Sequence, residues 1–488
     1  MKRIKLAMAP ARSHWTLEEA AERLLVDVNT LSRWERGKAT PRAYNIQRLC
    51  DVYNMTAEEL GLETGAAGEL PIVLPKEVYT EQQQQEDPST RSIQDIMRHD
   101  LELRLQCLIY DWQYRKAAGK SLAVLQRRLA QEIESDDAMA AANSPNHEPI
   151  DQARRDALRR LALVPLQALG LGFLGPIARA WTSEDILTHC AAGITACEYL
   201  AKGVHEDMAL ASYALSSYLP TLKAIVKQSS VHRKQAMQLV AQALNTLSTL
   251  ITHREGPKSG AVYAEQGIMY SRESGDLLAQ LSLLKEAAWV YACDKQSKKA
   301  AEKVLEARHL LEQASVPVPM LMQSCVYSTV AKNLSLHGQK DEALNALRQA
   351  HDTFSAASND DKNFSYMDAD LPHLFMNSGY TYYHLGQHDQ ALAAFAQIVD
   401  TETLTRKIPG VAERIRIEVM NHQALALLKR PEKDMELTIK LWQAGIKGAI
   451  ALRSEQRFSE ALSAYQIMEA LWPREKKILE LSELTRHW

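Results

Sequence analysis

A recurring spacing of small and aromatic residues within residues 189–488 restricts the fold of this chain more than any other feature. The clearest copy spans residues 374–399. Small or aromatic residues stand there at the positions where two helices would touch, namely Gly379, Tyr382, Gly386, Ala391 and Phe395. Further copies place an alanine at the corresponding position, which gives the series Ala261, Ala300, Ala343 and Ala391. A period of this length, in a sequence rich in Ala and Leu, predicts helix pairs stacked in an array.

These offsets resemble the tetratricopeptide repeat (TPR). Steps of 39, 43 and 48 residues separate Ala261, Ala300, Ala343 and Ala391. They exceed the regular period of about 34, so we expect lengthened helices or loops. The pattern assigns no register to residues 412–453. The resemblance implies an α-solenoid with a concave groove.

The same resemblance provides candidate groove residues. In the clearest copy the side expected to face the groove includes Tyr380, Tyr383 and His384. Polar amides on the first helices of repeats could clamp a peptide backbone, and these are Asn333, Asn377 and Asn421. The alternative for each of these residues is a solvated or purely structural role.

The N-terminal end differs from the rest of the chain in charge. Residues 1–48 contain ten lysines and arginines against five aspartates and glutamates, although the whole chain has a net charge of −3. A small basic head on an acidic body suggests that the head meets a polyanion.

The head also contains residues that typically begin and end short helices. Thr16 and Glu19 have the capping-box spacing and predict a helix that begins at Thr16. A second helix is expected from Val28 to Arg36, with Leu31 and Trp34 turned inward and Gly37 as its C-terminal cap. Two short helices joined by a tight turn predict a helix-turn-helix unit.

Residues 15–37, WTLEEAAERLLVDVNTLSRWERG, resemble the phage repressor/Cro helix-turn-helix (XRE family) without a gap. The resemblance implies a five-helix, lambda repressor-like domain whose second motif helix enters the major groove of double-stranded DNA. The residues expected to read base edges are Val28, Asn29, Ser32 and Arg33. Those expected to hold phosphates are Arg36, Lys38 and Arg42. Three residues depart from the family pattern, and these are Pro10, Leu17 and Leu25.

The expected fold is therefore all-α, with four segments. Residues 1–63 form the helix-turn-helix domain, 64–91 a flexible linker, 92–188 a helical connecting region and 189–488 the repeat domain. The helical stripe that begins at Asp95 fits either an intramolecular αα-hairpin or a dimerising segment.

The composition of the chain and the motifs that it lacks argue against other classes of protein. The six cysteines stand singly, without a C-x-x-C pair, which argues against a structural zinc site and favours a reducing, cytoplasmic compartment. The most apolar stretch, residues 161–181, is interrupted by Pro165 and Pro176, and its uninterrupted apolar part is shorter than the ~20 residues that span a membrane. No nucleophile elbow, phosphate loop or metalloprotease motif occurs, so we expect no enzyme, cofactor or metal.

A helix-turn-helix head joined to TPR-like repeats resembles the peptide-sensing transcriptional regulators of bacteria. That resemblance implies a DNA-binding regulator whose body senses a peptide, small molecule or protein and forms a homodimer. The alternative is a TPR scaffold or adaptor protein with a degenerate helix-turn-helix that reads no DNA.

Overall fold

The computed structural model describes part of the chain in detail. In the head, the described residues are 15–36, except 25 and 27, and positions 41, 49, 50, 53, 55, 60 and 62. In the rest of the chain they are 93–114, 121–143, 148–168, 182–357 and 369–486, except 409. The chain divides into two compact units, Met1–Pro88 and Ser89–Trp488. In the described residues the regular elements are helices, and one isolated bridge joins Val399 and Arg406. The chain is therefore all-α, as the sequence predicts.

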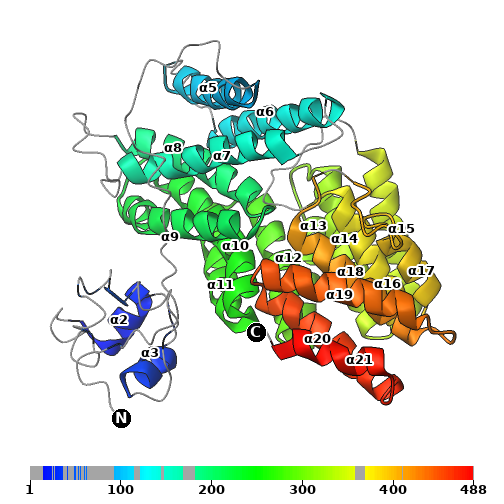
Figure 1. The fold of residues 1–488 in the computed structure, drawn as a ribbon. Helices are drawn as coiled ribbons and strands as arrows, with labels where there is room; N and C mark the ends of the chain where they lie inside the picture. Colours follow the sequence, from blue (N-terminus) through cyan, green and yellow to red (C-terminus); the bar gives the residue numbers. More distant parts are fainter. Residues whose placement is uncertain are drawn as a thin grey trace. The chain divides into compact units, whose positions relative to one another are not determined.

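The first unit contains the two helices expected for the motif (Figure 1). Helix α2 (Leu17–Leu24) begins one residue after Thr16, and α3 (Val28–Glu35) ends one residue before the predicted boundary. The two helices pack over a small apolar core. Its members that are at most 1% exposed are Ala20, Ala21, Leu24, Leu31, Leu49 and Leu60. The expected linker 64–91 lies outside the described residues.

The second unit begins with three long helices, α5 (Ile93–Tyr114), α6 (Leu122–Asn143) and α7 (Glu148–Ala168). They contact α8 and α9, and so the segment predicted as a connecting region packs on the start of the repeat body. Buried polar contacts reinforce this packing. The Gln126 side-chain amide donates to Gln242 Oε1 at 2.8 Å, and Arg159 forms an ion pair with the fully buried Asp207.

The repeat body consists of helices that follow one another in antiparallel pairs (Figure 1). In chain order they are α8 (Ser183–Leu200), α9 (His205–Lys227), α10 (Arg233–Glu255), α11 (Pro257–Ser274), α12 (Leu277–Cys293), α13 (Ser297–Glu312), α14 (Met320–Leu336), α15 (Lys340–Ala356), α16 (Leu371–His384), α17 (His388–Phe395), α18 (Glu413–Lys429), α19 (Met435–Ala451), α20 (Glu455–Leu471) and α21 (Lys476–Glu480), followed by the 3-10 helix η4 (Leu481–Arg486). Each pair contacts the next, as α12–α13 does α14–α15. This is the α-solenoid that the repeat spacing predicts.

Small residues allow the close approach of helices at the predicted places. A Cβ atom on Gly379 would overlap the ring of Phe395, so the glycine in α16 is required by the aromatic side chain of α17. Ala300, Ala343 and Ala391 are at most 2% exposed. Ala261 is only partly buried. Ala300, Ala343 and Ala391 each stand four residues after the N-cap of their helix, and in α11 that place is taken by the buried Gly260. The prediction for this weaker copy was therefore one residue out of register.

Residues 412–453, which the pattern left unassigned, form the pair α18–α19. Gly445 and Gly448 of α19 lie against Asn421 and Ile417 of α18, so this pair has its own small-residue contacts. A connection of seventeen residues precedes it, between the end of α17 and the start of α18, and contains the Val399–Arg406 bridge. This insertion shifts the spacing and explains why the register was lost.

The array closes on itself, because α20 contacts α10. His253 of α10 shares a hydrogen bond of 2.8 Å with Ser454, the N-cap residue of α20, although 201 positions separate them. Nearby, the Glu413 amide donates to the Lys202 carbonyl at 3.2 Å, and Arg414 donates to the Ala201 carbonyl. We call these contacts the closure. They bring the first helices of several pairs around a common centre.

Candidate functional site

Helix α3 has one face in the core of the head and one face outside it. Leu31 and Trp34 are at most 5% exposed and anchor the helix, as predicted. Val28 and Ser32 are half-buried, whereas Arg33 and Arg36 are exposed. Since these four residues follow the helical spacing i, i+4, i+5 and i+8, they share one side of α3. An α-helix of this kind, held by its inner face, can present the outer face to a groove of DNA.

The structure places the predicted contact residues only in part. Asn29 lies in α3, but its side chain is outside the described part, as are Lys38 and Arg42. Arg36 Nε donates to the Ser32 carbonyl at 3.1 Å, which holds its guanidinium at the end of α3. Val28 also packs against the core of the head, so only part of its side chain is available to a base.

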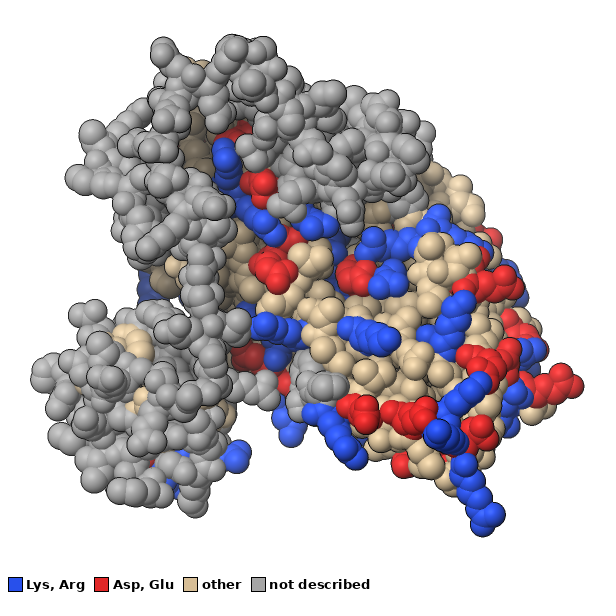
Figure 2. Space-filling model, in the orientation of Figure 1, with Lys and Arg blue, Asp and Glu red and all other residues tan. Residues whose placement is uncertain are grey.

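The repeat body presents a different electrostatic surface. On the face shown in Figure 2, basic and acidic side chains alternate over the described repeats. Ion pairs also occur within the repeat body, as between Arg272 and Glu306 and between Lys303 and Glu265. This face therefore offers no extended field of one sign for a polyanion.

Five of the six predicted groove residues fall into two groups, and Tyr380 is described separately below. Asn377 and Asn421 are at most 7% exposed, and their amides hold helices together. Asn377 Nδ2 donates to Ser328 Oγ and Asn421 Nδ2 to the Arg457 carbonyl, each at 3.0 Å. These two side chains are committed to contacts within the protein rather than to a groove. Asn333, Tyr383 and His384 are half-buried.

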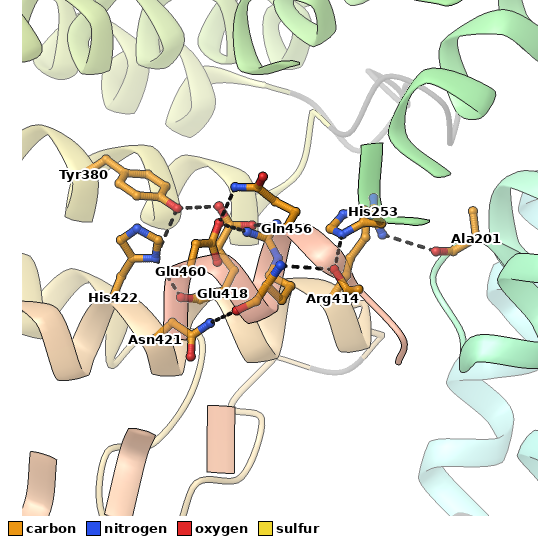
Figure 3. Close-up of polar contacts among 11 residues, drawn as sticks. Ala201, His253, Tyr380, Arg414, Glu418, Asn421, His422, Gln456 and Glu460 are labelled. Atoms are coloured by element: carbon orange, nitrogen blue, oxygen red, sulfur yellow. Dashed lines mark hydrogen bonds and ion pairs between the residues drawn. The ribbon is translucent and has the colours of Figure 1, made fainter. Parts of the chain in front are cut away.

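Tyr380 belongs to neither group, because it lies in a buried polar cluster (Figure 3). Its hydroxyl donates to Glu418 of α18, and its ring is packed edge-on against the His422 imidazole, with centroids 4.6 Å apart. Lys332 Nζ lies 4.1 Å from the centre of the same ring. Burial and the Glu418 carboxylate raise the pKa of Tyr380 well above its ordinary value, so the hydroxyl stays a donor.

Arg457 of α20 completes this cluster. Its guanidinium forms ion pairs with Glu418 and Glu460, and its side chain is 2% exposed. We call Lys332, Tyr380, Glu418, Arg457 and Glu460 the polar centre. Burial alone would raise the pKa of Glu418, but Arg457, His422 and Lys332 outweigh it and hold that pKa below its ordinary value. Burial lowers the pKa of Lys332, and Glu418 offsets part of this effect.

Sequence reasoning missed four members of the polar centre, because it examined only aromatic and amide side chains. The one available signal was the helical spacing of Glu418 with His422 and of Arg457 with Glu460 on first helices of repeats. Without a register for residues 412–453, that spacing could not be placed on the inner side of the array.

The described residues contain neither a metal site nor a membrane-spanning helix. Within those ranges, no three His, Cys, Asp or Glu side chains are grouped so that they could hold a metal ion. None of the described helices is long and apolar enough to cross a bilayer.

Comparison with known protein families supports the assignment of the head. A helix-turn-helix family model matches residues 6–60. Among solved structures, the TPR domain of P58(IPK) is 15% identical and covers 80% of this chain and 98% of its own, with a TM-score of 0.19. A TM-score this low carries no argument, and the solenoid rests on the helix pairs described above. No curated protein matches the sequence. The chain thus has a helix-turn-helix head and an all-helical repeat body.

Proposed function

We propose that this protein is a sequence-specific DNA-binding transcriptional regulator. The observation that carries the proposal is the division of α3 into a buried face, with Leu31 and Trp34, and an outer face with the exposed Arg33 and Arg36. The helix-turn-helix match over residues 6–60 and the excess of positive charge in residues 1–48 support it. Helix-turn-helix and TPR units act by binding, so we infer no catalytic step.

In this proposal α3 lies in the major groove of double-stranded DNA. Asn29 suits the bidentate edge of adenine, Arg33 suits guanine, and Val28 and Ser32 contact neighbouring bases. Arg36, Lys38 and Arg42 hold phosphates, which fix position without reading sequence. A regulator that meets chromosomal DNA in this way acts in the cytoplasm.

The test is a selection of bound oligonucleotides by the full-length protein at low salt. We expect an enriched motif, and Arg33→Ala should relax the preference at one base pair at a cost of about 1–3 kcal/mol. Lys38→Ala should weaken all sites alike, since a phosphate contact carries no sequence information. Lys298→Ala, on an exposed residue of α13, is the control and should change neither property. Failure to enrich any motif would refute the proposal.

We further propose that the repeat body senses a peptide, a small molecule or a protein partner. The half-buried Asn333, Tyr383 and His384 remain candidates for such contacts, whereas Asn377 and Asn421 are used to join helices. Native mass spectrometry of freshly purified protein should show a retained ligand or partner. A mass equal to that of the bare chain, together with no binding from a random peptide library, would contradict this part.

A scaffold or adaptor role with a degenerate helix-turn-helix is the second candidate. The observation that favours it is Leu17, which packs against the core of the head instead of presenting a polar group to a phosphate. Pro10 and Leu25, the other two departures from the family pattern, lie outside the described residues. A stoichiometric protein partner recovered without any chromosomal footprint would support this role over DNA binding.

A further inference from the structure

A groove with a volume of about 250 Å³ lies between α5 and α7, next to α8. Helix α5 lines it from Glu102 to Gln113, which corresponds to about 16 Å of helix. Helix α7 lines it from Ala157 to Val164, and α8 contributes His189. The groove is therefore long for its volume, and it suits an elongated molecule better than a compact one.

The floor of the groove is apolar and is already formed by the packing of the two helices. Leu105 and Ile109 of α5 and Ala157 and Leu161 of α7 are at most 5% exposed. Val164 is half-buried at the edge. A floor of this kind can cover the methylene groups of an aliphatic chain, and each methylene removed from water favours binding.

The charges that line the groove cancel each other. Among the described lining residues the only acidic and basic side chains are Glu102 and Arg160, and they form an ion pair at 2.9 Å. The Gln106 amide also donates to Glu102, at 3.3 Å. A charged ligand would lose its water here without meeting an uncompensated charge of opposite sign, which is unfavourable. The lining therefore favours an uncharged ligand.

Gln113 and His189 supply uncharged hydrogen-bonding groups to the groove. The nitrogens Gln113 Nε2 and His189 Nε2 lie 3.1 Å apart. Since the amide nitrogen can only donate, the imidazole nitrogen accepts and carries no proton. Burial lowers the pKa of His189 to about 4, against the opposing effect of Asp185, so the ring is neutral at physiological pH. The Gln113 amide still has an oxygen that can accept a hydrogen bond from a ligand.

We propose that this groove binds an elongated, uncharged amphiphile, namely an aliphatic chain that ends in an amide or hydroxyl group. The chain lies over Leu105, Ile109 and Leu161, and the polar end group forms a hydrogen bond with Gln113. The site goes beyond the proposed function, which places sensing in the repeat body. Because α5, α7 and α8 all line the groove, a bound ligand also joins the connecting helices to the start of that body.

The first experiment compares two probes by titration calorimetry with the full-length protein. Octanamide is uncharged, whereas octanoate has the same carbon chain with a negative charge at neutral pH. We expect octanamide to bind with a Kd below about 1 mM and octanoate to bind at least about tenfold more weakly. Equal affinity for the two probes would overturn the proposal, and so would the absence of octanamide binding at millimolar concentrations.

The second experiment locates the binding with variants of the lining. Val164→Trp at the half-buried edge should fill part of the groove and weaken octanamide binding at least about tenfold. Val262→Trp is the matched control, because Val262 is a 47% exposed valine of α11, and it should leave the affinity unchanged. Octanamide binding that survives Val164→Trp would place the probe elsewhere and overturn the proposal.

Gln113→Leu tests the polar end of the groove. Loss of the hydrogen bond should weaken octanamide binding about tenfold, and the substitution keeps the variant folded because it replaces a half-buried polar residue at the edge of the apolar floor. An unchanged affinity would contradict the assignment of Gln113.

Two other outcomes are distinguishable. A groove already filled by another segment of the chain would bind neither probe, and that result would overturn the proposal. The selection of bound oligonucleotides is a separate measurement on the head, so failure of the groove and failure of the proposed DNA binding are independent results.

Discussion

Replacing Arg457 with methionine would leave the Glu418 and Glu460 carboxylates in the polar centre without their shared cation. The side chains of Arg457 and Glu418 are only 2% and 4% exposed, so this pair belongs to the buried regime, in which removal of one partner costs about 3–5 kcal/mol. The Arg308–Glu312 pair is 44% and 47% exposed, and Arg308→Met should cost no more than about 1 kcal/mol. We therefore expect the free energy of unfolding to fall several times further in the first variant.

The pH dependence distinguishes this cause from a simple loss of packing. In the wild type the pKa of Glu418 is held below its ordinary value, so its contribution to stability is present at neutral pH and is lost in acid. Without Arg457, burial should raise that pKa, and protonation of the carboxyl should then relieve the penalty as the pH falls. Stability of Arg457→Met relative to the wild type should recover by up to about 1.4 kcal/mol per pH unit below the new pKa.

The assay is urea unfolding of the full-length protein, followed by far-ultraviolet circular dichroism at pH 7.5 and pH 5. A penalty below about 1 kcal/mol at pH 7.5 would show that Arg457 behaves as a surface charge. A penalty of the same size at both pH values would refute the electrostatic reasoning, even if the variant were strongly destabilised.

Two further perturbations test local features of the repeat body. Gly386, between α16 and α17, has φ +74° with no atom near a would-be Cβ, so Gly386→Ala should cost about 1 kcal/mol in urea unfolding through backbone strain alone; an unchanged midpoint would show that the turn relaxes. His253 faces Arg457, Arg414 and Ser454 in the closure, and burial together with the two arginines lowers its pKa well below the ordinary value. As the pH falls below about 6.5, His253 is protonated in the unfolded state but stays neutral in the folded state. The free energy of unfolding should therefore drop by up to about 1.4 kcal/mol per pH unit. His253→Gln should remove that part of the slope, and an identical slope in the variant would assign it to other groups.

Local sequence patterns were enough to predict features that depend on residues close together in the sequence, namely single helices and contacts within one helix pair. The capping residue Thr16 and the inward pair Leu31 and Trp34 predicted the two described helices of the head to within one residue. The offset between Gly379 and Phe395 predicted a contact that the structure contains, because both residues belong to one helix pair.

The polar centre could not be predicted in this way, since Lys332, Tyr380, Glu418 and Arg457 come from four different pairs. They meet only because of the curvature of the whole array, which no local period encodes. The same holds for the closure between His253 and Ser454. The sequence could not show which apolar residues of α5 face the core. Leu101 and Leu103 are both leucines of one helix, and only the structure shows that Leu101 is buried and Leu103 is exposed.

The contact between α20 and α10 makes the number of repeats a fixed property of this protein. In an open array, a duplicated helix pair lengthens the chain and disturbs only its neighbours. Here an additional pair would carry Ser454 away from His253 and would separate Arg457 from Lys332 and Tyr380. A whole helix pair can then be neither inserted nor deleted without loss of the contacts of the closure and the polar centre. We therefore expect changes of length to be tolerated in the connections between helices, such as the seventeen residues that lie between α17 and α18.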